Sequence, residues 1–164
     1  MSQSNRLALE DQLCFALYAA TNAIVRTYRP MLADLGLTYP QYLVMIVLWQ
    51  GGTCTVNDIA DRLCLPPSAI SPLLDRLEQA GLVQRSRDPS DRRTVLVSAT
   101  PAGAKLEAGA AQAQANVVCR TKMAPAEFAG LRSTLHQLMT QLSEDPSQGA
   151  EPALNPSPAG AAPA

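Results

Sequence analysis

The sequence predicts a mainly α-helical protein with a small β-hairpin, and three observations support this fold class. Apolar residues recur at three- and four-residue intervals through most of the chain. Two short strand-like runs flank a polar turn near its middle, and Thr, Pro and Gly stand where helices are expected to begin and end. With 164 residues, 47% of them hydrophobic, the chain has enough apolar material for the core of one domain.

The N-terminal part predicts two helices. The first has an apolar stripe, and we expect it to break near residues 29–30 and to end at Gly36 after one or two further turns. This stripe consists of Leu9, Leu13, Ala16, Leu17, Ala20 and Ile24. The second helix has Thr38 as its N-cap, Pro40 in its first turn and glycines at residues 51–52 as its end. It is apolar on nearly all sides, so we expect it to be buried.

The middle of the chain predicts a helix-turn-helix followed by a hairpin. Thr55 is expected to cap a short helix, and a tight break at residues 64–66 precedes a second helix from about Pro67 to Ala80. The runs LVQRSR and RTVLVSA are strand-like and flank the polar tip DPSDR. A helix-turn-helix followed directly by a two-stranded hairpin is a winged helix, which we assign to residues 37–99.

Two further helices are expected after the wing. Thr100 caps a helix that runs to about Lys122, and Pro125 begins the last helix, which has its own apolar stripe. We expect residues 9–36 and 100–142 to be dimerisation segments, because their apolar faces exceed what one small domain covers. Residues 1–8 are predicted to be flexible. Residues 143–164, which are rich in Pro, Ala, Gly and Ser, are predicted to be a disordered tail.

The composition excludes several classes of protein. The net charge of −1 and the pI of about 5.8 argue against coating nucleic acid or membrane through bulk charge. No run approaches the roughly 18 continuous apolar residues of a membrane span, and the N-terminus lacks a secretory signal, so a cytoplasmic protein is expected. Four scattered cysteines do not make a disulfide scaffold, and with a single histidine we expect neither a metal site nor a cofactor.

Cys14 can be interpreted in two ways from the residues alone. At 100° per residue, five residues fall within about 40° of one helical face: Cys14, Tyr18, Thr21, Val25 and Tyr28. A cysteine near a helix start is favoured as a thiolate, whereas free cysteines are more often small buried hydrophobes. In a straight helix, Tyr28 stands about 21 Å from Cys14, so contact between them requires a second subunit.

The run GLVQRSRDPSDRRTVLVSATPAG resembles the MarR family of transcription regulators, and the resemblance extends from about Leu7 to Leu142. The runs LEDQLCFALYAA and LGLTYPQYLVMIVLW are similar to those of its organic-hydroperoxide-sensing OhrR type, in the two-cysteine branch. The resemblance implies that Cys14 is the peroxide-reactive cysteine and that Cys119 resolves it. It also implies that Tyr28 and Tyr39 of the partner subunit hydrogen-bond to Cys14. Cys54 and Cys64 match no redox position.

The winged helix also predicts DNA-contacting residues. The exposed polar candidates on the second helix of the helix-turn-helix are Ser68, Ser71 and Arg76. The resemblance implies that Arg93 enters the minor groove with Asp91 bracing it, and Arg92 is a second candidate. Two alternatives stay open: Arg76 as a solvated charge, and Asp91 with Arg93 as an ion pair that only stiffens the hairpin. Pro66, Pro67 and Ala69 stand where relatives often have polar residues, which leaves fewer side chains for base edges.

The resulting hypothesis is a homodimeric repressor, not an enzyme, that binds double-stranded operator DNA. An organic hydroperoxide oxidises Cys14 to a sulfenic acid, a disulfide with Cys119 follows, and DNA is released. The alternative within the family is a repressor that responds to a small phenolic or drug-like ligand in a pocket lined by Tyr28 and Tyr39. A thiol peroxidase is disfavoured, because neither a thioredoxin-like strand-helix alternation nor a CxxC motif is present.

Overall fold

The computed structural model describes residues 8–143 in two units, one ending at Met123 and one beginning at Ala124, and each is described by itself. The predicted flexible N-terminus and the predicted disordered tail lie outside the described residues, except for Ala8 and Ser143.

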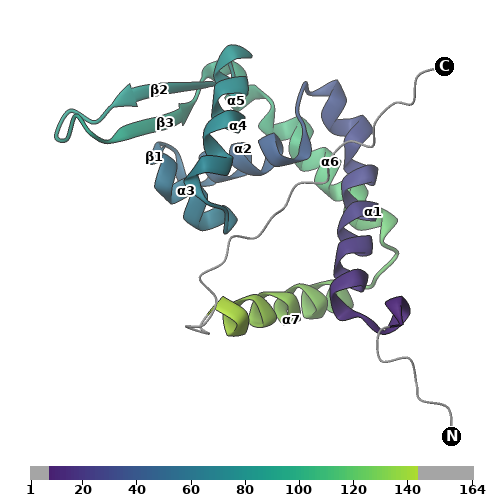
Figure 1. Cartoon of the computed structure of the whole chain (residues 1–164). Coiled ribbons are helices and arrows are strands. Elements are labelled where there is room, and N and C mark those ends of the chain that lie inside the picture. The colour runs from purple at the N-terminus through teal and green to yellow at the C-terminus, as the bar shows by residue number, and fades with distance from the viewer. Residues whose placement is uncertain (1–7, 144–164) are drawn as a thin grey trace, which may run out of the picture. The chain divides into compact units, whose positions relative to one another are not determined.

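The first unit is mainly helical, with a small sheet (Figure 1). Its elements are a 3₁₀ turn Leu9–Asp11, α1 Leu13–Asp34, α2 Tyr39–Gly51, β1 Cys54–Thr55, α3 Val56–Leu63, α4 Pro67–Gln79, β2 Val83–Arg87, β3 Val95–Ala99, α5 Pro101–Lys105 and α6 Glu107–Arg120. The second unit consists of α7 Pro125–Ser143. The predicted winged helix-turn-helix is therefore confirmed, with α3 and α4 as its two helices and the β2–β3 hairpin as its wing.

The sheet is antiparallel, in the order β1-β3-β2. Val97 of β3 pairs with Arg85 of β2 on one side and with Cys54 of β1 on the other. The sequence predicted only the β2–β3 hairpin. The third strand, β1, has two residues and precedes the α3 cap directly, which is too short for an alternating pattern to be visible.

The core of the first unit surrounds α2, as its all-round apolar sequence predicted. The side chains that are almost completely buried include Val44, Met45, Ile59, Ile70, Leu74, Leu77, Val83 and Val97. They come from α2, both helices of the helix-turn-helix and the two wing strands, so the winged helix-turn-helix and the core form one packed body. No single helix among residues 8–143 is long and apolar enough to span a membrane; α1 and α2, bent by 73°, meet that test only as a pair.

Helix ends follow the predicted chemistry. Thr38 and Gln41 form a capping box at α2, Thr55 and Asp58 form one at α3, and Thr100 accepts a hydrogen bond from the Gly103 amide at α5. Gly36 and Gly81 adopt positive φ angles of 69° and 71° after α1 and α4, a conformation that glycine adopts without strain.

Two expected helix boundaries are wrong. The first helix does not break near Pro30, because α1 continues to Asp34. Tyr28 and Leu32 lie one turn apart and are both buried, while Pro30 is exposed, so packing on the inner side holds the helix through the proline. After Thr100 the chain forms two helices rather than one, because a turn at Leu106 separates α5 from α6.

Close packing against the Leu82 backbone explains the glycine at position 103, the last residue of the Thr-Pro-x-Gly sequence after the wing. A Cβ atom at this position would meet the backbone carbonyl of Leu82, and it would lie 3.0 Å from Cε of Met45. The helix backbone therefore approaches the end of the α4–β2 connection more closely than any residue with a side chain permits.

We predict that Gly103→Ala lowers the free energy of unfolding by about 2 kcal/mol or more, because backbone atoms cannot move aside as a flexible side chain does. Gly130→Ala in α7 is the matched control, since its added Cβ would meet nothing within 4 Å. Urea unfolding followed by circular dichroism measures both variants. Equal midpoints for the two variants would contradict this account of Gly103.

Candidate redox site and nucleic-acid interface

Cys14 lies in the first turn of α1 and is exposed. The helix begins without a side-chain cap. Gln12 occupies the N-cap position, and its side-chain amide Nε2 donates a hydrogen bond to the Ala8 carbonyl at 3.3 Å. The first backbone N–H groups of α1 therefore have no capping side chain.

The N-terminal half of α1 exposes several large hydrophobic side chains, and the acidic Glu10 and Asp11 lie in the turn just before it. On the N-terminal half of α1, Leu13 is 60% exposed and Tyr18 is 58% exposed. Phe15 and Ile24 are also exposed large hydrophobic residues. The predicted face that begins at Cys14 changes along its length: Tyr18 and Thr21 are exposed, Val25 is partly buried, and Tyr28 is buried. Half of α1 thus packs within the chain and half presents apolar side chains to its surroundings.

Three tyrosines form a cluster at the other end of this face. The ring centroids are 5.3 Å apart for Tyr28 and Tyr39, 5.4 Å for Tyr28 and Tyr42, and 5.9 Å for Tyr39 and Tyr42. Sequence reasoning identified Tyr28 and Tyr39 and missed Tyr42. The spacing in TYPQY contained the signal, because residues three apart lie on the same side of a helix.

Burial controls the ionisation of this cluster. Burial and the nearby Tyr42 phenol, to which Tyr28 is hydrogen-bonded, raise the pKa of Tyr28 far above its usual range. The pKa values of Tyr39 and Tyr42 are raised by burial as well. The three phenols are uncharged at neutral pH, and the hydrogen bond between Tyr28 and Tyr42 already uses the proton of one of these two hydroxyls.

The cluster is packed against the rest of the core through Trp49. The Tyr42 and Trp49 ring centroids are 6.5 Å apart, and the indole Nε1 of Trp49 donates a hydrogen bond to the Gly103 carbonyl at 3.1 Å. The tyrosines on α1 and α2 thereby connect to the start of α5, next to the wing.

Cys14 and Tyr28 cannot meet within one chain. Both lie on α1, 14 residues apart, which corresponds to about 21 Å along the helix axis. The predicted break near residue 29 would not have changed this distance, since it follows Tyr28.

Cys119 lies in the last turn of α6 and is exposed. α6 packs antiparallel to α1: Asn116 Nδ2 contacts Met31 Sδ at 3.7 Å, while Gly109 lies against Leu35 further along α1. Cys119 lies within one turn of Asn116, which contacts Met31, whereas Cys14 lies about 25 Å from Met31 along α1. Cys14 and Cys119 of one chain therefore lie too far apart for a disulfide, whose Cα atoms are within about 7 Å of each other.

The other two cysteines have structural positions. Cys54 lies in β1, where burial, with a contribution from the Asp58 carboxylate, raises the pKa of its thiol and disfavours the reactive thiolate. Cys64 is the C-cap of α3 with a φ angle of 53°, in the turn of the helix-turn-helix. That neither cysteine is a redox residue stays a prediction, and Cys64 is exposed.

The recognition helix α4 exposes the predicted polar residues. Ser68, Ser71 and Arg76 all lie on its solvent side, opposite the buried Ile70 and Leu74. The Ser71 hydroxyl donates a hydrogen bond to the Pro67 carbonyl at 3.2 Å, so its proton is used within the helix and its oxygen remains available as an acceptor.

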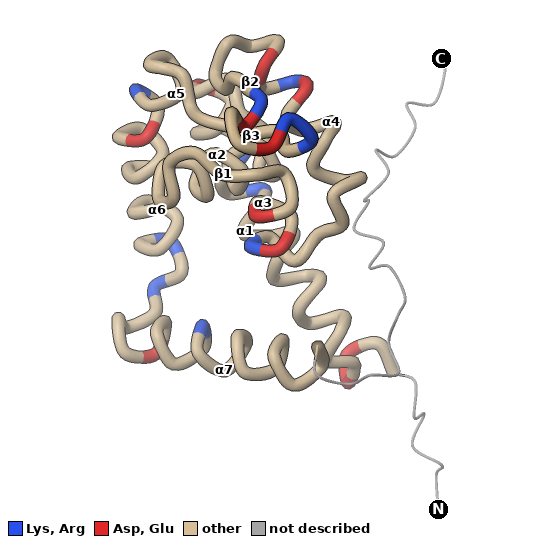
Figure 2. Tube along the Cα trace, turned by 90° about the vertical axis from the view of Figure 1, so that its left-hand side faces the viewer, with Lys and Arg blue, Asp and Glu red and all other residues tan. Residues whose placement is uncertain are grey.

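The wing loop is held by its two aspartates. Asp88 Oδ1 accepts hydrogen bonds from the Ser90 amide and hydroxyl at 2.8 and 2.6 Å. Asp91 accepts them from the Arg93 amide at 3.0 Å and from the Thr94 hydroxyl at 3.1 Å. Asp91 thus braces the backbone at Arg93, and no ion pair between these two side chains occurs in the described part of the chain. Figure 2 shows basic and acidic residues side by side along this hairpin.

Arg85 is a wing residue that the sequence analysis did not single out. Its Nη1 atom lies 2.7 Å from Asp75 Oδ1 and 3.1 Å from Glu78 Oε2, and its Nη2 donates to the Ser71 carbonyl at 3.4 Å. Arg85 therefore connects strand β2 to the recognition helix. The sequence did contain a signal for this contact. In the alternating run VQR, Arg85 falls on the same face as the apolar Val83, and two acids spaced three apart, Asp75 and Glu78, precede it.

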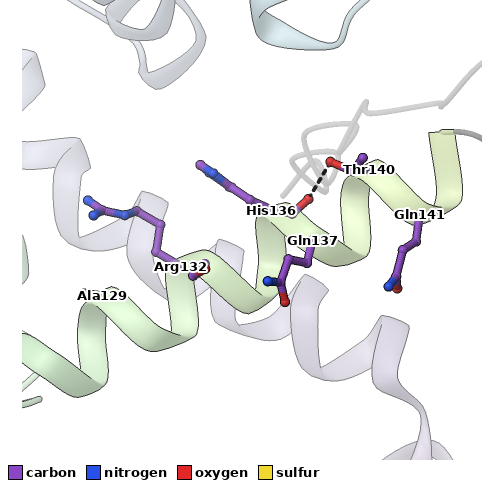
Figure 3. A pocket seen from close by; sticks show the side chains of 7 residues that line it. Ala129, Arg132, His136, Gln137, Thr140 and Gln141 are labelled. Atoms are coloured by element: carbon purple, nitrogen blue, oxygen red, sulfur yellow. Dashed lines mark hydrogen bonds between the residues drawn. The ribbon is translucent and has the colours of Figure 1, made fainter.

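A hollow on α7 does not form a ligand site. Figure 3 shows the side chains beside it, and the Thr140 hydroxyl there donates to the His136 carbonyl one turn earlier at 3.1 Å. The residues that border it are Ala129, Arg132, Ser133, His136, Gln137, Thr140 and Gln141. All of them belong to one helix, so the described residues do not enclose this hollow, and neither Tyr28 nor Tyr39 borders it.

The raised tyrosine pKa values predict a loss of stability at alkaline pH. Phenols of the unfolded chain ionise near pH 10, while the clustered phenols of the native chain keep their protons. The native state then binds more protons, so the free energy of unfolding falls as the pH rises above about 9.5. Urea midpoints between pH 8 and 10.5 measure this fall, and Tyr28→Phe should make it shallower. The same slope in Tyr28→Phe would contradict the assignment to this cluster.

Comparison with known proteins identifies the family. The family profile described as "MarR family" matches residues 37–95. The organic hydroperoxide resistance transcriptional regulator of Bacillus subtilis (strain 168) is 36% identical over 140 residues, which cover 85% of this chain and 95% of the relative.

Among solved structures, reduced AbfR bound to DNA matches with a TM-score of 0.70 and 30% identity, over 87% of this chain and 100% of that chain. The disulfide form of AbfR, a Staphylococcus epidermidis protein, matches with a TM-score of 0.58 and 34% identity, over 80% and 92%. The chain therefore belongs to the MarR family of transcriptional regulators.

Proposed function

We propose that this protein is a dimeric repressor that binds operator DNA in its reduced form and releases it when an organic hydroperoxide oxidises Cys14. The observation that carries the proposal is the position of Cys14 on α1: an exposed thiol that cannot reach the tyrosine cluster or Cys119 of its own chain. A second copy supplies both.

The proposed dimer brings the two ends of α1 together. If the α1 helices of two subunits cross, Cys14 of one subunit lies beside Tyr28 and Tyr39 of the other. In each chain α6 ends close to Tyr28, because it packs antiparallel to α1, so Cys119 belongs to the same neighbourhood. The exposed apolar residues of α1 and the apolar stripe of α7 supply the surface that such a dimer buries.

The proposed chemistry uses two thiols as the reductant. The Cys14 thiolate attacks one peroxide oxygen, the O–O bond breaks, and the alkoxide leaves and takes up a proton to become an alcohol. The protonated tyrosine cluster stabilises the thiolate by donating hydrogen bonds. Cys119 of the partner then attacks the sulfenic sulfur and water leaves, so one hydroperoxide and two thiols become an alcohol, a disulfide and water.

The comparisons support this assignment. The Bacillus subtilis relative is named for organic hydroperoxide resistance, and AbfR has been solved reduced on DNA and in a disulfide form. The apolar residues around Cys14, including Phe15 and Leu17, favour organic hydroperoxides over hydrogen peroxide. On the DNA side, α4 enters the major groove and the wing directs Arg92 and Arg93 toward the minor groove.

The proposal predicts a disulfide-linked dimer on a non-reducing gel after one equivalent of cumene hydroperoxide, reversed by dithiothreitol. Cys14→Ser and Cys119→Ser should not form it, whereas Cys54→Ser should, because only the first two thiols take part. If mass spectrometry finds the Cys14 thiol unmodified in the treated wild type, Cys14 is a packing residue. The family alternative, a small phenolic or drug-like ligand, then takes its place.

The wing predicts a specific salt dependence. Removing one phosphate-neutralising side chain lowers the slope of log K against log[salt] by about 0.9. Because each subunit of the proposed dimer carries one Arg93, we expect Arg93→Gln to lose about 1.8 units of slope, twice about 0.9, in fluorescence anisotropy with a duplex selected by the wild type from a randomised pool. Lys105→Gln in α5 is the control, and it should keep the wild-type slope. An unchanged slope in Arg93→Gln would remove Arg93 from the DNA interface.

A further inference from the structure

The ion pairs of Arg85 involve the surface that faces DNA in the proposed function. On α4, Ser68, Ser71 and Asp75 fall within about 60° of one another at 100° per residue. Asp75 thus lies on the same face as the predicted DNA contacts, with its side chain 55% exposed. A free carboxylate at this position would repel phosphate.

Strand geometry explains why Arg85 reaches α4 and not solvent. Arg85 pairs with Val97, which is completely buried, and residues paired across a strand share one face of the sheet. Val83, two residues before Arg85, is also buried. Arg85 is therefore on the inner face of the wing at the edge of the core, and its side chain is only 26% exposed.

We infer that Arg85 is a positioning residue for DNA binding, which acts through Asp75 and Glu78 instead of contacting DNA. It forms ion pairs with two carboxylates of the recognition helix at 2.7 and 3.1 Å, which offsets one of their two negative charges, and its backbone amide also donates to Glu78 Oε1 at 3.3 Å. Together with the bond from its side chain to the Ser71 carbonyl, these contacts hold the wing and α4 in one orientation. The inference rests on the DNA-binding part of the proposed function.

This role differs from that of the other wing arginines. Arg87 is exposed, and its Nη1 donates to the Arg92 carbonyl at 3.3 Å within the wing itself. Arg87 has the same charge and lies on the same strand two residues later, yet it makes no ion pair in residues 8–143. Arg87→Gln is therefore a matched control for the loss of one positive charge from the hairpin.

The test is a mutant cycle measured by fluorescence anisotropy at a single salt concentration, with the selected duplex as probe. Arg85→Gln is measured in the wild-type background and in an Asp75→Asn/Glu78→Gln background. We expect it to weaken binding about tenfold or more in the first background and less than about twofold in the second, because the acids through which it acts are gone. Arg87→Gln should have the same effect in both backgrounds.

An equal loss from Arg85→Gln in both backgrounds would overturn the inference and make Arg85 a direct phosphate contact. If circular dichroism finds Arg85→Gln unfolded, Arg85→Lys completes the same cycle, because lysine keeps the charge and loses the double contact. If the wild-type protein selects no duplex from the pool, DNA binding itself has failed, and that outcome differs from every result of the cycle.

Discussion

The length of one rigid helix sets the constraint on which the proposed switch depends. α1 carries Cys14 in its first turn and Tyr28 about 21 Å further along, and buried residues on both sides of Pro30 keep it continuous. No rotation of side chains brings these two groups together in one chain. In the proposed function, the thiol at one end of α1 and its hydrogen-bond donors at the other therefore come from two subunits, and this couples the proposed redox state to the subunit arrangement.

The same packing that holds the tyrosines also reaches the DNA-binding elements. Tyr42 contacts Trp49, Trp49 donates to the Gly103 carbonyl, and Gly103 lies directly against the Leu82 backbone, where β2 begins. Every step is a buried or half-buried contact between elements that have little room to adjust, because protein interiors are close-packed. α2 carries two of the three tyrosines, Tyr39 and Tyr42. It is also the centre of the core against which α4 and the wing pack.

The sequence predicted features that depend on neighbouring residues and missed those that depend on distant ones. Thr38, Thr55 and Thr100 cap their helices as expected, since a cap involves residues within one turn. The helix through Pro30 was missed because burial of Tyr28 and Leu32 against other elements outweighs the local preference of proline. The contacts of Arg85 with Asp75 and Glu78 join residues seven to ten positions apart across a helix end and a strand start. Periodicity within the strand places Arg85 on the inner face, but it does not identify the acids that Arg85 contacts on the neighbouring helix.

The low net charge is consistent with a proposed switch that changes the positions of the DNA-contacting residues and not the bulk attraction to DNA. A strongly basic protein would remain bound to DNA through counterion release even after its two wings had moved away from their DNA sites. This chain has a net charge of −1, and one of its wing arginines is occupied by acids of the recognition helix. In the proposed function, affinity rests on a few side chains on α4 and the wing loop, which the proposed dimer duplicates. If the proposed disulfide between subunits displaces one of the two winged domains, its DNA contacts are lost, and the low net charge does not replace them.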